Sequence, residues 1–319
     1  MDSEDFKSGF VGIIGRPNVG KSTFLNKVIG EKVAIVTDKP QTTRDRIMGI
    51  HHFEGGQIVF LDTPGMHRSK RHLNKQMVRI AVRAFDDADI LLCFFEPPVA
   101  ELGYPGASAG IFLDEENSLT LEHLAKTAHP KFLVLNKVDV LDGGASAGEW
   151  KGRDLLQPLR VAIERNVKFE QVFVISAETG EGVDELVSAL IEKLPQGPPY
   201  FPEDMFTDQT DRTFAAEVIR EKLFDLTRKE IPYSSAVTIE EFEEEEDPVR
   251  ILALIHVERD SQKGIVIGHQ GQMIKEIGTA ARADIEEFLG CKVFLKLDVR
   301  VSKDWSKDNR IMKRIEYGA

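Results

Sequence analysis

The chain has 319 residues, which is the length of about two domains of ordinary size. Its formal net charge of −12 argues against a general nucleic-acid coat protein, because such proteins need a large positive charge. No signal peptide and no long apolar run is evident, so we expect a cytoplasmic protein without a transmembrane segment. The two cysteines, Cys93 and Cys291, are expected to be buried free thiols in a reducing compartment.

The first informative stretch is a glycine-rich loop between an apolar strand at residues 10–14 and a helix at residues 22–29. Its pattern is G-x-x-x-x-G-K-S, in which backbone amides at a helix start surround phosphate oxygens. Lys21 would reach the β- and γ-phosphates, and the Ser22 hydroxyl would bind Mg²⁺. A chance glycine turn is the alternative, and the flanking strand and helix argue against it. The nucleotide-binding residues expected here are Gly15, Arg16, Pro17, Asn18, Val19, Gly20, Lys21, Ser22 and Thr23.

A second apolar strand, at residues 57–61, ends at a carboxylate, Asp62. We expect Asp62 to hold Mg²⁺, through water, and the Gly65 amide to sense the γ-phosphate. By itself the sequence Asp-Thr-Pro-Gly is an ordinary turn. Its position after a strand, about forty residues beyond the loop, favours the nucleotide role. The whole segment comprises Asp62, Thr63, Pro64, Gly65 and Met66.

A base-recognition loop is predicted after the strand at residues 131–135, with the sequence Asn136, Lys137, Val138 and Asp139. Asp139 would accept hydrogen bonds from guanine N1 and N2. Adenine lacks that donor pair, so a site built for guanine would leave a carboxylate unpaired against ATP. Asn136 would hold the loop and contact the base edge, and the Lys137 stem would pack on the base. The alternative is a solvated turn.

A further strand, at residues 171–175, precedes Ser176 and Ala177, where a backbone amide is expected to meet guanine O6. The order of these segments predicts an α/β P-loop GTPase domain with a mostly parallel sheet and helices on both faces. The expected cofactors are GTP or GDP and Mg²⁺.

Helix propensity falls around the proline-rich residues 194–202, which predicts a linker. We place the GTPase domain at residues 1–196, the linker at 197–210 and a smaller α+β domain at 211–319. Its elements are predicted at 211–230 (helix), 234–242 and 249–257 (strands), a helix that continues to 289, and 292–301 (strand). The order α-β-β-α-α-β fits a type II KH domain, which binds RNA.

The sequence Gly-His-Gln-Gly at residues 268–271 is the loop by which KH domains clamp an RNA backbone. Ile265, Ile267 and Ile274 would form an apolar floor for bases; a plain helix–turn–helix is the alternative. Residues 240–247 carry seven acids, whereas residues 300–314 carry six basic residues against two acids. That basic stretch is read as an edge facing RNA or the ribosome, or alternatively as a solvated helix. The residues assigned to RNA are Gly268, His269, Gln270, Gly271, Ile274, Lys275, Lys303 and Arg310.

With these motifs and the sequence Gln-Thr-Thr-Arg at residues 41–44, the chain resembles the Era family of bacterial GTPases over nearly its whole length. The resemblance implies that Thr43 adds a second hydroxyl to Mg²⁺ and that Asn18 positions K⁺. Met66 stands where many small GTPases carry a glutamine that orients water, so its apolar side chain cannot do so. The residues expected to act in catalysis are Lys21, Thr43, Gly65 and Asn18.

The resemblance also implies a GTP-hydrolysing switch that binds the 3′ end of small-subunit ribosomal RNA and assists assembly of that subunit. The nucleotide state would change the switch segments, at residues 32–46 and 66–75. A monomer with peripheral contact to the inner face of the cell membrane is expected. Residues 97–113 are predicted to be an insertion, to which we assign no function. Two other interpretations are an RNA-binding scaffold with little GTP hydrolysis and a phosphate-loop metabolic kinase.

Overall fold

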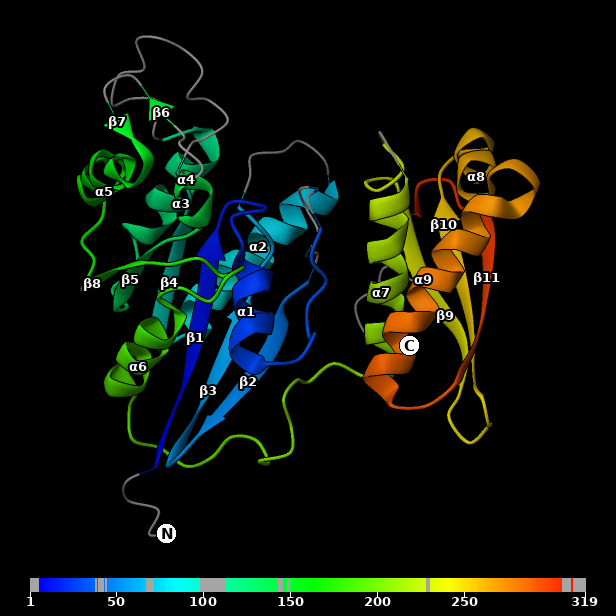
Figure 1. Cartoon of the computed structure of the whole chain (residues 1–319), viewed down its shortest axis with the longest axis horizontal. Helices are drawn as coiled ribbons and strands as arrows, with labels where there is room; N and C mark the ends of the chain where they lie inside the picture. Colours follow the sequence, from blue (N-terminus) through cyan, green and yellow to red (C-terminus); the bar gives the residue numbers. More distant parts are fainter. Residues whose placement is uncertain are drawn as a thin grey trace. The chain divides into compact units, whose positions relative to one another are not determined.

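Two units of packing share the chain, and each has a sheet and a core of its own (Figure 1). One unit comprises Met1–Ala34 and Thr43–Asp208, and the other comprises Ile35–Thr42 and Gln209–Ala319. The structure is a computed structural model. It describes residues 6–37, 39, 43, 45–66, 72–97, 113–142, 146–147, 150–227, 230–305 and 311.

The sheet of the first unit has six strands in the order β2-β3-β1-β4-β5-β8. All neighbours are parallel except β2, which runs antiparallel to β3. Parallel strands covered on both faces need apolar side chains on both, which is why β1, β3, β4 and β5 are continuous apolar runs. The strands are β1 (Lys7–Gly15), β2 (Ile47–Phe53), β3 (Gly56–Asp62), β4 (Ile90–Phe95), β5 (Lys131–Leu135) and β8 (Gln171–Val174).

Helices cover both faces of this sheet, so that it has two cores (Figure 1). One core joins α1 and α6 to the sheet and includes the aromatic trio Phe24, Phe60 and Phe94. The other joins α2, α3 and α5 to the opposite face. The remaining elements are α1 (Lys21–Ile29), α2 (His72–Asp87), α3 (Glu115–Leu124), α4 (Asp139–Asp142), β6 (Ser146–Ala147), β7 (Trp150–Lys151), η3 (Gly152–Leu155), α5 (Leu156–Glu164) and α6 (Val183–Lys193).

The predicted motif segments all follow the carboxyl ends of strands in this sheet. The glycine-rich loop follows β1, Asp62 ends β3, and Asn136 follows β5. Ile13 on β1 is in register with Asp62 on β3. Because parallel strands end at one edge of a sheet, this topology brings the segments together, as in other open α/β sheets that bind ligands.

The stretch after α6 lies against the first unit rather than standing free of it. The Ile50 amide donates to Phe206 O at 2.9 Å, and Thr207 Oγ1 donates to Met48 O at 2.8 Å. These bonds satisfy part of the open edge of β2, which would otherwise expose unpaired backbone groups. Buried Gln57 fixes the stretch further back, because its Oε1 accepts from the Tyr200 amide at 2.6 Å.

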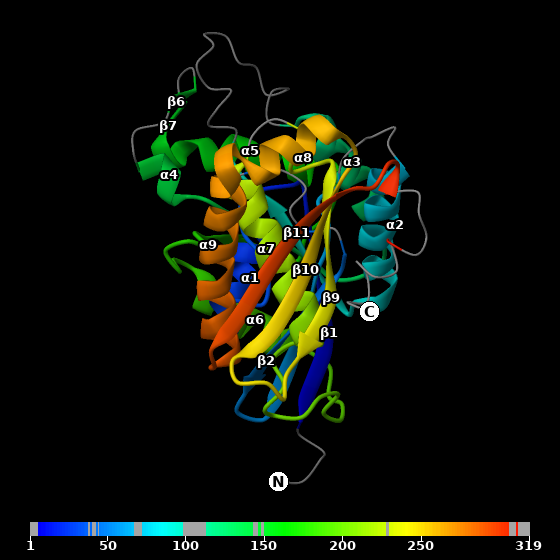
Figure 2. The ribbon, with the colours of Figure 1, turned by 90° about the vertical axis from the view of Figure 1, so that its right-hand side faces the viewer.

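The second unit has the predicted order of elements, and the KH fold is confirmed. Its sheet has the order β11-β10-β9, with β10 parallel to β11 and antiparallel to β9. Figure 2 shows these strands in front of α7 and α9, whose apolar residues form one core with β10. The elements are α7 (Asp211–Leu226), β9 (Ser235–Glu243), β10 (Val249–Val257), α8 (Asp260–Ile267), η4 (His269–Gly271), α9 (Gln272–Leu289) and β11 (Val293–Val301).

One predicted helix boundary was wrong. Helix α7 ends at Leu226 rather than near residue 230, because Thr227 turns to an extended conformation. Helix α3 begins at Glu115, where the Asp114 side chain caps it by accepting from the Asn117 amide. Residues 98–112 of the predicted insertion lie outside the described residues. None of the described helices has the length and apolar content that crossing a membrane requires.

The expectation of two buried thiols is half wrong. Cys93 is fully buried on β4, but Cys291 is exposed. Cys291 directly follows the left-handed Gly290 that ends α9, so it lies in a surface turn before β11.

We therefore expect the folded protein to expose one reactive thiol. Burial raises the pKa of the Cys93 thiol, so that residue supplies almost no thiolate, the nucleophilic form. A thiol titration with an aromatic disulfide should detect Cys291 quickly in the native chain and Cys93 only after denaturation. The Cys291→Ser variant is the control and should show no fast reaction. Fast reaction at Cys93 would contradict the described packing of β4.

Candidate functional site

The phosphate loop is held tightly between β1 and α1. Gly20 has φ 94°, and a Cβ there would lie 2.2 Å from Asn136 Nδ2. That nitrogen donates to Val19 O at 2.8 Å, so the close approach has a purpose: it fastens the loop to the segment after β5. A side chain at position 20 would break this contact, which explains the glycine.

Lys21 is buried beneath this loop. Its ammonium donates to Arg16 O at 2.9 Å and to Gly15 O at 3.3 Å. Burial lowers the pKa of Lys21 to about 8, since the charged form is costly away from water. A bound polyphosphate would add negative charge and raise that pKa again. The site therefore holds a cation whose charge an anionic ligand would stabilise.

Three predicted metal-binding residues meet at one point. Ser22 Oγ donates to Asp62 Oδ2 at 2.5 Å and lies 3.2 Å from Thr43 Oγ1. The other carboxylate oxygen, Asp62 Oδ1, is buried and has no hydrogen-bond partner. Burial also raises the pKa of Asp62, because a charged carboxylate there lacks solvent. Hydroxyl and carboxylate oxygens are ligands that Mg²⁺ accepts, and an unpartnered buried oxygen suits a metal-bound water, so these residues fit the predicted ion.

The segment after Asp62 touches the phosphate loop directly. A Cβ on Gly65 would lie 2.4 Å from the Pro17 nitrogen, and the Met66 amide donates to Gly15 O at 3.1 Å. The Met66 side chain is fully buried in the core that also contains Ile14. It therefore has no access to an attacking water. Pro64 is buried, and Thr63 Oγ1 donates to Ile13 O at 2.8 Å.

The predicted base loop has one unfilled acceptor. Asp139 Oδ1 is buried without a hydrogen-bond partner, as expected of an atom that awaits guanine donors. Lys137 has φ 62°, an uncommon conformation for a residue with a side chain. Val138 is fully buried, and its amide donates to Ile175 O.

The amide of Ala177 is already engaged. It donates to Asn136 Oδ1 at 2.9 Å, whereas Ser176 Oγ accepts from the Thr179 amide at 3.1 Å. An amide that meets guanine O6 must therefore share the Ala177 donor or be another amide of this loop. Asn136 emerges as the residue that connects three segments of the site.

The Gly-x-x-Gly loop of the second unit has the backbone that glycine permits. Gly268 and Gly271 have φ 72° and 79°, and a Cβ on Gly268 would lie 2.6 Å from Met273 Cβ. His269 and Gln270, between them, are exposed.

The helices on both sides of this loop divide apolar residues between core and surface. Val266 and Ile277 are buried, whereas Ile265 is 49% exposed. Ile267 and Ile274 are partly exposed. Apolar side chains left open beside a glycine-rich loop are consistent with the predicted floor for bases. Lys275 and Lys303 are also exposed, and Arg310 lies outside the described residues.

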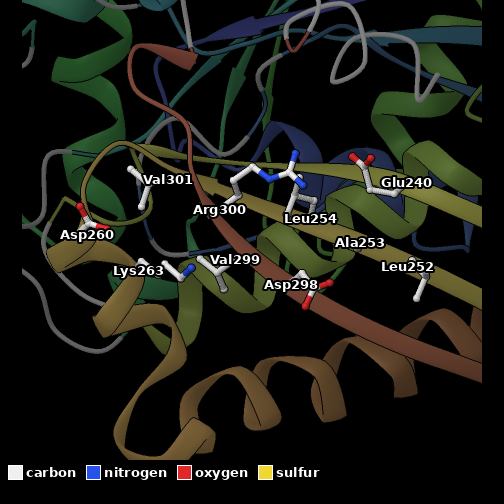
Figure 3. Close-up of a pocket in the computed structure, with 10 residues that line it drawn as sticks. All are labelled: Glu240, Leu252, Ala253, Leu254, Asp260, Lys263, Asp298, Val299, Arg300 and Val301. Atoms are coloured by element: carbon white, nitrogen blue, oxygen red, sulfur yellow. The ribbon is translucent and has the colours of Figure 1, made fainter.

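A hollow of about 470 Å³ opens on the KH sheet, between its strands and the first turns of α8 (Figure 3). Charges of both signs surround it, with Asp260 and Lys263 on α8 and Asp298 and Arg300 on β11 (Figure 3). No residue assigned individually to a site lines it, although Arg300 belongs to the basic stretch at residues 300–314 that is predicted to face RNA. Mixed charge without a buried unpaired group does not define a ligand, so we assign none.

Comparison with known proteins agrees with this geometry. The model of a family described as a 50S ribosome-binding GTPase matches residues 10–137, and the KH domain model matches residues 230–306. GTPase Era of Geobacter metallireducens is 49% identical in an alignment 319 residues long, which covers 99% of this chain and 100% of that protein. GTPase Era of Lacticaseibacillus paracasei is 45% identical over 311 residues, 97% of this chain and 96% of that one.

The chain belongs to the GTPase Era family. Two solved Era structures share its fold. Era in complex with MgGDPNP and nucleotides 1506–1542 of 16S ribosomal RNA matches with a TM-score of 0.85 at 35% identity, over 98% of this chain and 99% of that one. A variant of Aquifex aeolicus Era bound to GDP and AlF₄⁻ matches with a TM-score of 0.82 at 36% identity, with the same coverage.

Several contacts of this Era-family chain are not apparent from its sequence. Arg16 is predicted to lie at the nucleotide, and its guanidinium is paired with Glu96 and Asp114. Lys39 Nζ donates to Thr227 O at 2.6 Å, and Glu221 accepts from the Val36 amide at 3.0 Å, both within the second unit. No local pattern signals these partners, because each pair is distant in sequence.

We expect Asp139→Asn to exchange guanine for xanthine. The new amide presents a donor to the guanine donors, so GDP affinity should fall about 10²-fold or more, as two charge-assisted hydrogen bonds are lost. Xanthosine diphosphate has an acceptor at position 2 and should bind the variant better than the wild type. Calorimetry with both nucleotides measures this. Asp142→Asn, in the same helix but exposed and paired with Arg153, is the control and should leave GDP affinity unchanged. Unchanged GDP affinity in Asp139→Asn would contradict base recognition by Asp139.

Proposed function

We propose that this chain is a GTP-hydrolysing switch that binds the 3′ end of small-subunit ribosomal RNA and assists assembly of the small ribosomal subunit. The carrying observation is the pair of buried, unpartnered carboxylate oxygens on Asp62 and Asp139, one at the metal position and one at the base position. Similarity to Era in complex with MgGDPNP and a 16S ribosomal RNA fragment supports the assignment of a guanine nucleotide and of ribosomal RNA as ligands.

In this proposal hydrolysis depends on positioning and charge rather than on a protein base. Lys21 would neutralise charge on the β- and γ-phosphates. Ser22, Thr43 and Asp62 would hold Mg²⁺, which would supply positive charge beside the phosphates. The Gly65 amide would contact the γ-phosphate. Met66 is fully buried, which supports the proposal that no side chain at this position orients the attacking water.

We assign RNA to the Gly-x-x-Gly loop at residues 268–271, with Ile274 and Lys275 beside it and Lys303 and Arg310 further along the chain. The domain limits that we propose remain 1–196, 197–210 and 211–319. A monomer and a peripheral contact with the membrane face complete the proposal; sedimentation of the purified chain alone and with anionic vesicles tests both. Sedimentation as a dimer would contradict the proposed monomer, and failure to sediment with vesicles would contradict the proposed membrane contact.

Nucleotide state is proposed to reach the RNA site through residues 35–42. These residues belong to the second unit, where Lys39 donates to the carbonyls of Phe224 and Thr227 near the end of α7. The next residue, Thr43, lies beside Ser22 at the metal position. A metal-bound Thr43 therefore constrains a segment that the second unit also holds.

The test is RNA affinity in three nucleotide states. We expect the affinity of the chain for an oligonucleotide of the small-subunit rRNA 3′ end to differ severalfold between GTP analogue, GDP and no nucleotide. The difference should shrink in Lys39→Ala, which removes the bonds to α7, and persist in Lys168→Ala, which changes an exposed lysine of the first unit outside both switch segments. Equal affinities in all three states would refute the coupling, and full activity of Lys21→Ala in cells would favour a scaffold without functional hydrolysis.

We further propose that Asn18 positions K⁺ near the phosphates. Asn18 has φ 60°, which holds the crest of the phosphate loop in an uncommon conformation. A monovalent cation there would add positive charge where hydrolysis develops negative charge. Single-turnover hydrolysis should be faster in K⁺ than in Na⁺ at equal ionic strength, and equal rates would end the idea.

A further inference from the structure

Four charged side chains form a cluster that joins the phosphate loop to the base loop. Glu96, just after β4, accepts a hydrogen bond from Arg16 Nη2, and its other oxygen lies 2.6 Å from Lys137 Nζ. Asp114 Oδ2 accepts from Arg16 Nη1 at 2.6 Å. Glu96 is thus in contact with a residue of each loop, and Asp114 steadies one of them.

The centre of the cluster is sheltered more than an ordinary surface pair. The side chains of Arg16 and Glu96 are 22% and 13% exposed, whereas the Arg160–Glu164 pair on α5 is 44% and 35% exposed. Lys137, at the rim of the cluster, is 38% exposed. Solvent screens exposed pairs until they contribute little, but it screens sheltered pairs less. Removing one partner of a sheltered pair also leaves the other charge without compensation.

The Arg16 guanidinium is held by two carboxylates, Glu96 and Asp114. In the sequence, one precedes and the other follows residues 97–113. Asp114 is itself fixed, because its Oδ1 caps α3 by accepting from the Asn117 amide at 2.6 Å. Arg16 therefore braces the phosphate loop against the sheet edge, and its charge is balanced before any phosphate arrives.

We propose that Glu96 is a positioning residue for the nucleotide: by holding Arg16 and Lys137 together, it makes the phosphate and base loops grip GDP or GTP as one unit. This rests on the proposed GTP site. Lys137 has φ 62°, a strained conformation that surrounding contacts must maintain. The ion pair with Glu96 supplies such a contact on the side chain whose stem is expected to cover the base.

Electrostatic repulsion alone would change GDP affinity in the opposite direction. The Glu96 carboxylate acts on the charge of Lys21, so it would also repel nucleotide phosphates, and its removal would tighten binding. Against this, the carboxylate is in direct contact with two cations, which cancel most of its field at a distance. We therefore expect that, when the Glu96 charge is removed, the loss of loop positioning outweighs the loss of repulsion between Glu96 and the phosphates. Weaker GDP binding would indicate positioning, and tighter GDP binding would indicate repulsion.

The test is Glu96→Gln, which keeps the shape and removes the charge. We expect GDP affinity to fall about tenfold, the size expected for loss of one charge-assisted hydrogen bond, mostly through faster dissociation. Fluorescent GDP measures both. Glu164→Gln, the loss of an exposed paired carboxylate on α5, is the matched control and should change neither.

Two further readouts distinguish positioning from a merely structural role. In the Lys137→Met background, the effect of Glu96→Gln should shrink to about threefold or less, because one of its partners is already gone. The preference for GDP over inosine diphosphate, which lacks the 2-amino group, should also fall in Glu96→Gln, since Asp139 lies only two residues after Lys137.

Tighter or unchanged GDP binding in Glu96→Gln would overturn the proposal, as would effects of the two substitutions that simply multiply. A lower melting temperature of the nucleotide-free variant with unchanged base preference would assign Glu96 to folding instead. Failure of the wild-type chain to bind GDP would refute the proposed function itself, which is a separate outcome.

Discussion

The nucleotide site depends on one buried amide side chain, that of Asn136. Its nitrogen donates to Val19 O in the phosphate loop, and its oxygen accepts from the Ala177 amide after β8. Asn136 is 1% exposed, so both bonds form where an unpaired polar atom would be costly. The two bonds therefore fix the positions of the phosphate loop, the segment after β5 and the segment after β8 relative to one another. Asn136 also occupies the space that a side chain at position 20 would need, which explains Gly20.

Around this fixed point the structure leaves polar atoms unsatisfied. The buried oxygens of Asp62 and Asp139 lack partners, and Lys21 is buried with its pKa lowered. Each of these groups costs stability in the chain alone, since folding removed its water. Each is complementary to one part of a magnesium guanine nucleotide: the metal, the base and the phosphates. These groups destabilise the folded chain alone, and a bound nucleotide would stabilise it by supplying the missing partners.

The two units use glycine for the same physical purpose at different ligands. In the phosphate loop and in the Gly-x-x-Gly loop, glycine with positive φ lets backbone approach closely at a helix start. Close approach of backbone amides suits anionic oxygens, whether of a nucleotide or of an RNA backbone. Charged side chains then hold the loop in position, which is the role that we propose for Glu96 and Arg16 in the first unit.

The sequence by itself determined the fold class, the strands that carry the motifs and the loops that follow them. Continuous apolar runs reveal β1, β3, β4 and β5 because both their faces are covered, and the spacing of glycines predicts the two loops to which we assign ligands. Strand β2 was not predicted, since Gly49, His51 and His52 interrupt its apolar pattern; its pairing with β3 makes it a strand.

Only the tertiary structure decided which distant residues meet. Asn136 and Val19 are 117 positions apart, and Arg16 and Glu96 are 80 apart, so no local pattern couples them. The exposure of Cys291 and the hold of the second unit on Lys39 are likewise consequences of packing. Local sequence sets local backbone and the side of an element that is apolar. The arrangement of sheets and helices then determines which polar atoms find a partner and which remain for a ligand.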